Sequence, residues 1–138
     1  MGQAIVHFEI EGRDGPKLQE FYSELFDWSI DVLPDNPADY GMVHREQHLA
    51  ASGVGIGGAV SSVPAQPSTT WRGPTRDEGY TGHVTVYVEV PDVETALQHA
   101  ESLGGRRMLG PDPLWPGVEI GKFADPEGHL IGVMTAAQ

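Results

Sequence analysis

The sequence predicts an α+β fold made of two copies of one module, in which a strand and a helix are followed by three more strands. Two amphipathic helical segments each follow a short strand, and each begins directly after an aspartate, Asp14 or Asp92. When Asp14 is placed on Asp92, at an offset of 78 residues, three apolar positions of the two segments coincide: Leu18 with Ala96, Tyr22 with Ala100 and Leu25 with Leu103. This shared pattern, which is not a shared identity, indicates an internal duplication.

Both helices are predicted from their first residue and their apolar face. An aspartate side chain before a helix can accept hydrogen bonds from the first free backbone N–H groups. The apolar residues that follow repeat every three or four positions, which is typical of one face of a helix. These residues are Leu18, Phe21, Tyr22 and Leu25 in the first helix and Ala96, Leu97, Ala100 and Leu103 in the second.

The remaining strands and the linker complete the two modules. Strand-like segments lie at 29–33, 39–44 and 49–60, and again at 106–109, 118–124 and 129–135. The stretch Asp125-Pro126-Glu127-Gly128 is typical of a tight turn. We therefore expect a single domain over residues 1–138, with one half at about 1–60 and the other at about 83–138. The proline-containing segment 61–82 is expected to be disordered or to form a lid over a site.

Composition excludes several classes of function. The chain has no cysteine, which excludes disulfides, thiolate catalysis and cysteine-bound zinc. Twenty acidic and eight basic residues give a formal net charge of −12, which disfavours nucleic-acid binding. No apolar stretch is long enough to span a membrane, and no signal peptide is visible. A cytoplasmic protein without membrane or nucleic-acid partners is expected.

Alternation along two strands predicts polar faces that could line a pocket. Val6, Phe8 and Ile10 share one face of the first strand, whereas His7 and Glu9 share the opposite face. In the first strand of the second half, valines occupy one face, and His83, Thr85 and Tyr87 occupy the other. The aliphatic faces are expected to pack against the helices. The polar faces either face water or, in a duplicated module, close around a cleft.

Four segments in this order resemble one known superfamily. IVHFEIEGRD, FYSELFDW, PDVETALQHAESLGG and FADPEGHLIGV are similar to the glyoxalase, bleomycin-resistance and extradiol-dioxygenase superfamily, also called vicinal oxygen chelate proteins. The resemblance covers nearly the whole chain and is weakest from Pro34 to Gly82. It implies paired βαβββ modules that form an open eight-stranded cup, and very often a homodimer.

The resemblance also implies where metal ligands would lie, on the first, fourth, fifth and eighth strands. His7 fits the first position, but the matching positions of the second half are Thr85 and Gly132, and the fourth strand has no carboxylate or imidazole. His83 could serve only if the strand register differs from the one expected. Because a catalytic zinc takes at least three protein ligands, the sequence favours a pocket without metal.

The other candidate groups leave several interpretations open. His7 and Glu9 could be a metal-free acid–base pair, a polar patch that recognises a ligand, or a wetted sheet face. His44, His48, His99 and His129 are expected to be surface residues. Tryptophans in loops, Trp71 and Trp115, could stack on a planar ligand or fill a dimer contact; Trp28 is expected to pack against the end of its helix.

The leading functional prediction is metal-independent binding of a small molecule, by analogy with the drug-resistance members of the superfamily. The ligand would be a planar aromatic antibiotic or natural product, and we expect it to be sequestered between two protomers. The alternative is a lyase, isomerase or dioxygenase that uses a divalent ion such as zinc, nickel, manganese or iron, or His7 alone as a base. A third interpretation is a regulatory dimer with a vestigial pocket. The expected ligand-binding residues are His7, Glu9, Trp71, His83, Thr85, Tyr87 and Trp115.

Overall fold

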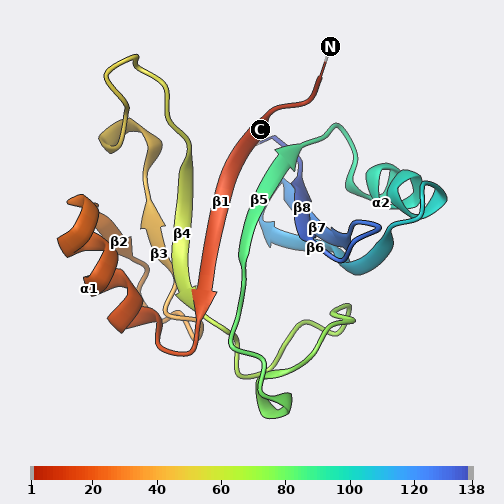
Figure 1. Ribbon diagram of the computed structural model, residues 1–138, viewed down its shortest axis with the longest axis horizontal. Coiled ribbons are helices and arrows are strands. Elements are labelled where there is room, and N and C mark those ends of the chain that lie inside the picture. Colours follow the sequence, from red (N-terminus) through yellow and green to blue (C-terminus); the bar gives the residue numbers. More distant parts are fainter. Residues whose placement is uncertain (1, 137–138) are drawn as a thin grey trace. The chain divides into compact units, whose positions relative to one another are not determined.

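The computed structural model describes residues 2–136 and divides the chain into two compact units. The N-terminal unit comprises residues 7–66 and 74–84, and the C-terminal unit comprises residues 2–6, 67–73 and 85–136. Each unit contains four strands and one helix in the order βαβββ (Figure 1). The predicted α+β fold class, built from paired βαβββ modules, is therefore confirmed for the part of the chain that the structure describes.

The sheet of the N-terminal unit has the strand order β2-β3-β4-β1. Strands β1 and β4 are parallel, whereas β3 is antiparallel to both of its neighbours. Helix α1 lies against one face of this sheet and contacts β4 (Figure 1). The elements are β1 (Ile5–Gly12), α1 (Gly15–Phe26), β2 (Ile30–Val32), β3 (Gly41–Val43) and β4 (Gly57–Ser62), with the short 3₁₀ turns η1 (Arg45–Gln47) and η2 (Arg76–Glu78).

Helix α1 begins as predicted but packs through different residues. The side chain of Asp14 accepts a hydrogen bond from Lys17 N at 3.1 Å, which confirms the cap. Phe21 and Leu25, expected on the buried face, are more than half exposed, at 56% and 57%. The contact with β4 is instead made by Gln19, whose side-chain nitrogen donates to Val60 O at 2.8 Å and to Asp39 O at 2.6 Å.

Trp28 packs at the end of α1 as expected. Its ring lies 5.5 Å from Tyr22 and 5.4 Å from Phe26, both on the helix. It also lies 5.5 Å from Phe8 on β1, so that this face of β1 joins the apolar layer beneath the helix. The aliphatic face of β1 was predicted to lie there.

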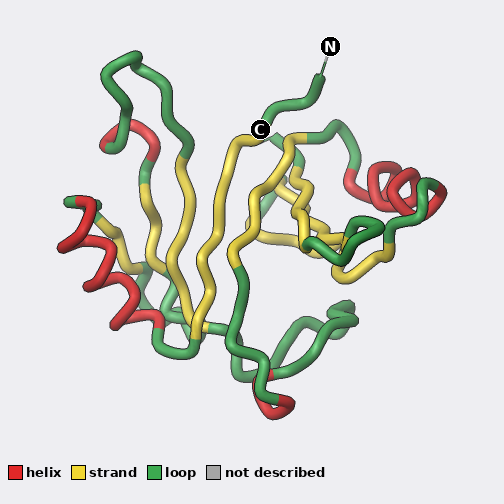
Figure 2. The backbone as a smooth tube through the Cα atoms, in the orientation of Figure 1, coloured by secondary structure: helices red, strands yellow, loops and turns green. Residues whose placement is uncertain are grey.

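The expected strand at 49–60 is wrong over its first eight residues. Residues 49–56 form a loop, and β4 runs from Gly57 to Ser62 (Figure 2). A tight turn closes this loop, because Ala50 N donates to Val54 O at 2.9 Å and Gly53 N donates to Ala50 O at 2.8 Å. Gly53 has φ +83°, a conformation that glycine adopts without strain and that a strand cannot contain.

The sheet of the C-terminal unit has the order β5-β8-β7-β6. Helix α2 is capped by Asp92, whose carboxylate accepts from Thr95 N at 2.8 Å, and the predicted Asp125 turn is closed by Gly128 N donating to Asp125 O at 2.8 Å. The elements are β5 (Val84–Glu89), α2 (Val93–Ser102), β6 (Arg106–Trp115), β7 (Val118–Ala124) and β8 (Leu130–Met134).

The apolar core of the C-terminal unit lies between α2 and its sheet. Its buried members are Val90, Val93, Leu97 and Val133, and Val88, Ala96 and Phe123 pack against them. This places the valine face of β5 beneath the helix, as predicted. Among residues 2–136, no helix is both long enough and apolar enough to cross a membrane.

Candidate functional site

The polar face of β1 is buried. His7 and Glu9 are only 9% and 6% exposed, which excludes the interpretation of a sheet face wetted by water. The residues on β4 that pair with this face of β1 are small: His7 pairs with Gly57, Glu9 with Ala59 and Glu11 with Ser61. Residues paired across two strands project from the same face. Strand β4 therefore leaves room above a row of three titratable side chains on β1.

His83 joins this row because of its backbone register. Glu11 N donates to His83 O at 2.9 Å, and His83 N donates to Glu11 O at 3.2 Å. The imidazole Nε2 then lies 3.5 Å from Glu9 Oε1 and 3.6 Å from Glu11 Oε1. One donor atom from each of these three residues lies within 4.8 Å of the other two. We call Glu9, Glu11 and His83 the acid cluster. The first-strand metal ligand was expected at His7, and the acid cluster begins two residues further along β1, at Glu9.

Two tyrosines complete the surroundings of the acid cluster. Tyr80 Oη makes a short hydrogen bond with His83 Nδ1, the ring nitrogen that faces away from the carboxylates. The turn η2 positions Tyr80, because Thr75 and Glu78 form a capping box and Tyr80 N donates to Thr75 O at 3.2 Å. On the other side, Tyr40 Oη lies 3.5 Å from His7 Nε2.

Burial and the two carboxylates shift the pKa values of these groups. Burial lowers the pKa of His7 from its ordinary value, although the nearby Glu9 carboxylate opposes this effect. Burial raises the pKa of Tyr80 to about 12, with further contributions from Glu11 and Glu9. The same causes, burial first, raise the pKa of Tyr40 far above its ordinary value. At neutral pH the imidazole of His7 is therefore uncharged, and both phenols keep their protons.

The donor atoms of the acid cluster suit a divalent metal ion. Two carboxylates and one imidazole are hard and borderline donors, which zinc, manganese and iron(II) all accept. With Nε2 turned to a metal, the Nδ1–H of His83 would donate to Tyr80 Oη, and a hydrogen bond of this kind orients a metal-binding histidine. Ser61 also indicates that something binds here, since its buried Oγ has no hydrogen-bond partner among residues 2–136. A buried hydroxyl without a partner is costly, and a bound ligand or water would remove that cost.

In the C-terminal unit, Thr85 and Tyr87 are almost fully buried, at 1% and 2% exposure. Tyr87 pairs with Gly132, and a Cβ atom at position 132 would lie 2.4 Å from the Tyr87 ring. The ammonium group of Lys122, itself 6% exposed, lies 5.8 Å from the centre of the same ring. The missing eighth-strand ligand thus has a physical reason: the Tyr87 ring occupies the space that any side chain at Gly132 would need.

The two loop tryptophans have different surroundings. Trp71 is half-buried in a segment tied to β6, since Arg72 N donates to Met108 O at 2.8 Å and Thr70 Oγ1 donates to Asp112. Trp115, at the end of β6, is 39% exposed and lines a groove of about 1070 Å³. Of the four predicted ligand-binding residues in this unit, which are Trp71, Thr85, Tyr87 and Trp115, only Trp115 lines this groove.

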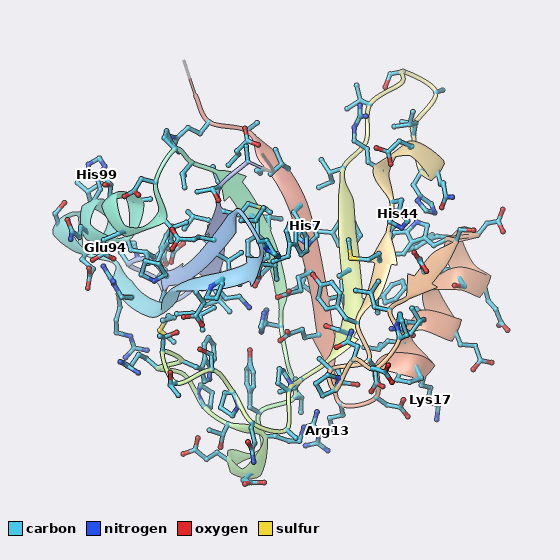
Figure 3. All side chains as sticks on the ribbon, turned by 180° about the vertical axis from the view of Figure 1, so that it is seen from behind. His7, Arg13, Lys17, His44, Glu94 and His99 are labelled. Atoms are coloured by element: carbon cyan, nitrogen blue, oxygen red, sulfur yellow. The ribbon has the colours of Figure 1, made fainter. Side chains whose placement is uncertain are left out.

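The remaining histidines lie outside the acid cluster. His44 pairs with Asp31 at 3.2 Å near the surface, across β4 from His7 in Figure 3. His99 is exposed on α2, and His129 pairs with Asp125 at 3.0 Å. His48, also expected at the surface, is partly exposed; it accepts from Ser29 N at 3.0 Å and contacts His44 O at 2.7 Å, so it holds two loop backbones together.

Glu11, Tyr40 and Ser61 were not among the site residues predicted from the sequence. The period-two pattern on β1 contained the signal for Glu11, because Glu11 continues the face that carries His7 and Glu9. No local pattern pointed to Tyr40 or Ser61: Ser61 lies on β4, which pairs with β1, and Tyr40 directly precedes β3, which pairs with β4.

Comparison with family models matches residues 7–134 to a glyoxalase-like domain. The chain belongs to the glyoxalase-like domain family. This confirms the resemblance to the glyoxalase, bleomycin-resistance and dioxygenase superfamily. A comparison of this glyoxalase-like protein with curated sequences finds no match.

Solved structures share the fold of the glyoxalase-like protein at low sequence identity. A variant of methylmalonyl-CoA epimerase from Streptomyces coelicolor, in complex with 2-nitronate-propionyl-CoA, has a TM-score of 0.63 and 17% identity, covering 97% of both chains. A glyoxalase/bleomycin resistance protein/dioxygenase superfamily member from Vibrio splendidus 12B01 has a TM-score of 0.58 and 13% identity, covering 98% of this chain and 100% of the other. Enzymes and members of resistance-type families thus share this architecture.

Proposed function

We propose that this glyoxalase-like protein is a metal-dependent lyase or isomerase that moves a proton next to a carbonyl group. The observation that carries the proposal is the acid cluster: two carboxylates and an imidazole, each no more than 12% exposed, with donor atoms within 4.8 Å of one another. Two carboxylates held close together with little access to water repel each other, and a cation bound between them would stabilise the cluster. The fold shared with methylmalonyl-CoA epimerase supports this class of reaction by analogy.

Each residue near the cluster has a distinct role in this proposal. Glu9, Glu11 and His83 would hold a divalent ion, which supplies positive charge against the negative charge that develops on a substrate oxygen. His7 is uncharged at neutral pH, because burial lowers its pKa, and it can accept the proton that leaves carbon. Tyr40 keeps its proton and lies 3.5 Å from His7 Nε2, where it can orient the imidazole.

Metal retention tests the site directly. Purified protein is incubated with excess zinc, nickel, cobalt, manganese or iron(II), desalted and analysed for metal content. We expect about one equivalent per chain in the wild type and a loss in His83→Ala and Glu11→Gln, because a site with three ligands does not survive the loss of one. His44→Ala is the matched control, since His44 also pairs with a carboxylate but lies outside the cluster.

Proton exchange then tests the reaction. Methylmalonyl-CoA and a panel of small carbonyl compounds are incubated with the metal-loaded protein in D₂O, and deuterium incorporation is followed by NMR. Exchange that disappears in His7→Gln, while this variant still retains metal, supports the assigned base. Metal retention without exchange of any compound would remove the enzymatic proposal but leave the metal site.

Sequestration of an aromatic compound, the function favoured from the sequence, is the second candidate. The observation in its favour is that Tyr40 and Tyr80 lie near the carboxylates of Glu9, which is buried, and Glu11, which is partly buried, a combination suited to an aromatic ligand with a positive charge. Isothermal titration with planar cationic antibiotics tests it in metal-free protein. Tight binding that Glu9→Gln weakens, together with no metal retention, would favour sequestration over the lyase or isomerase.

A further inference from the structure

The groove beside Trp115 is built entirely from the C-terminal unit and contains none of the acid cluster. Three backbone hydrogen-bonded segments form its walls. Glu89 N donates to Ala4 O at 2.9 Å at one wall, and Thr135 N donates to Glu119 O at 3.1 Å at another. The third wall is the hairpin between β6 and β7. The groove has a volume of about 1070 Å³, which is sufficient for a small organic molecule.

The hairpin turn holds Trp115 in place. Pro116 and Gly117 form its two-residue loop, and Gly117 has φ +84°, as the third position of a type II turn requires. Trp115 pairs with Val118, which is 2% exposed and anchors the hairpin to the core. Pro113 pairs with Glu119, so an apolar ring and a carboxylate lie next to each other on the groove wall. The indole is therefore presented to the groove by a tight two-residue turn.

The charges that line the groove are all of one sign. Glu89, Asp92 and Glu119 contribute three carboxylates, and none of the described lining residues is a lysine, an arginine or a histidine. Thr95 donates to the Asp92 carboxylate through both its side chain and its backbone, which keeps the pKa of Asp92 below its usual range. An anionic ligand would be repelled here, whereas a cation would be attracted by the carboxylates and by the face of the indole ring.

We infer that this groove binds a small organic cation with an apolar body, such as a quaternary or aromatic ammonium compound. Trp115, Pro113 and Pro116 would contact the apolar body and the positive charge through the indole face. The carboxylate of Glu119, exposed beside Pro113, would lie close to the ammonium group. The site is independent of the acid cluster, because no residue is shared between them.

Benzyltrimethylammonium chloride is the probe, with benzyl alcohol and benzoate as its neutral and anionic counterparts. Binding to the full chain is measured by saturation-transfer NMR, and the Trp115 indole N–H resonance is assigned as the one that disappears in Trp115→Phe. We expect this resonance to shift with the cation and not with benzoate. Trp115→Leu should weaken binding by roughly 3- to 30-fold, as the loss of a cation–π contact implies. Glu119→Gln should weaken it by a smaller factor.

Two controls separate a built site from general attraction to an acidic protein. Glu127→Gln removes an exposed carboxylate of the same unit that does not line the groove, and it should leave the affinity unchanged. Equal weakening by Glu119→Gln and Glu127→Gln, or equal binding of tetramethylammonium in the wild type and in Trp115→Leu, would overturn the inference. A groove filled by a second copy of the chain would also overturn it. In that case the wild type would not bind the probe, and Trp115→Leu would lower the mass of the assembly in solution.

Discussion

Burial beside β1 acts in opposite directions on the two kinds of titratable side chain found there. It lowers the pKa of His7 and raises those of Tyr40 and Tyr80, because in each case it disfavours the charged form. The carboxylates of Glu9 and Glu11 add to the effect on both tyrosines, and that of Glu9 opposes the effect on His7. All three side chains are therefore uncharged at neutral pH.

The lowered pKa of His7 predicts that acid destabilises the fold. In the unfolded chain the pKa of this imidazole returns to about 6.5, so below that pH the unfolded state binds more protons than the folded state. The contribution of His7 is fully present above about pH 6.5 and is lost as the pH falls towards the folded-state pKa. Urea unfolding at several pH values between 5 and 8 measures the slope of the free energy of unfolding.

His7→Gln should flatten that slope by at most about 1.4 kcal/mol per pH unit, the limit for one proton. The control is His99→Gln, because His99 is exposed on α2 and its substitution removes an imidazole without changing a buried site. If His7→Gln and wild type keep the same slope, His7 is not held uncharged by the fold.

At the scale of the elements, α1 shows where apolar periodicity misleads. The pattern predicted the helix and its cap correctly, but two of its four apolar positions are more than half exposed. The buried positions are Gly15 and Gln19, which a hydropathy pattern cannot select. Gly15 is required because a Cβ atom there would lie 2.7 Å from Ser62 N. Close approach of the helix to β4, made possible by a glycine, places the Gln19 amide within reach of the Val60 carbonyl on β4 and the Asp39 carbonyl in the loop before β3.

Gln19→Ala should destabilise the protein by about 1–3 kcal/mol, because it leaves the buried Val60 carbonyl oxygen and the part-buried Asp39 carbonyl oxygen without this donor. The measurement is the free energy of unfolding in urea. Glu20→Ala, at the next and exposed position of the same helix, is the matched control and should change it by less than about 0.5 kcal/mol. Equal effects of the two substitutions would show that Gln19 does not anchor α1.

At the scale of the whole molecule, the exposed apolar side chains of α1 indicate a surface through which two chains could associate. Phe21, Leu25 and Phe26 are between 55% and 57% exposed on one short helix. Side chains of this kind gathered on a surface are typical of interaction sites. We expect this helix to contribute to a homodimer, as the family resemblance implies.

Sedimentation equilibrium measures that assembly directly. The wild type should have the mass of two chains, and Phe21→Glu should shift the equilibrium to monomer, because a carboxylate cannot be buried in an apolar contact without cost. Ala51→Glu introduces the same charge in an exposed loop of the same unit and should leave the mass unchanged. A monomeric wild type, or dimers in both variants, would contradict this assignment.

The sequence by itself determined the two βαβββ modules, the capped starts of both helices and the Asp125 turn, because each depends on residues close together in the chain. It also placed His7 and Glu9 on one face of a strand, since alternation is a local property. Only the tertiary structure decided that His83 belongs with Glu9 and Glu11, because the register between Glu11 and His83 joins residues far apart in sequence. Register is set by backbone pairing between distant segments. Because Glu11 pairs with His83, the candidate site is centred on the acid cluster, two residues along β1 from His7, where the sequence had placed it.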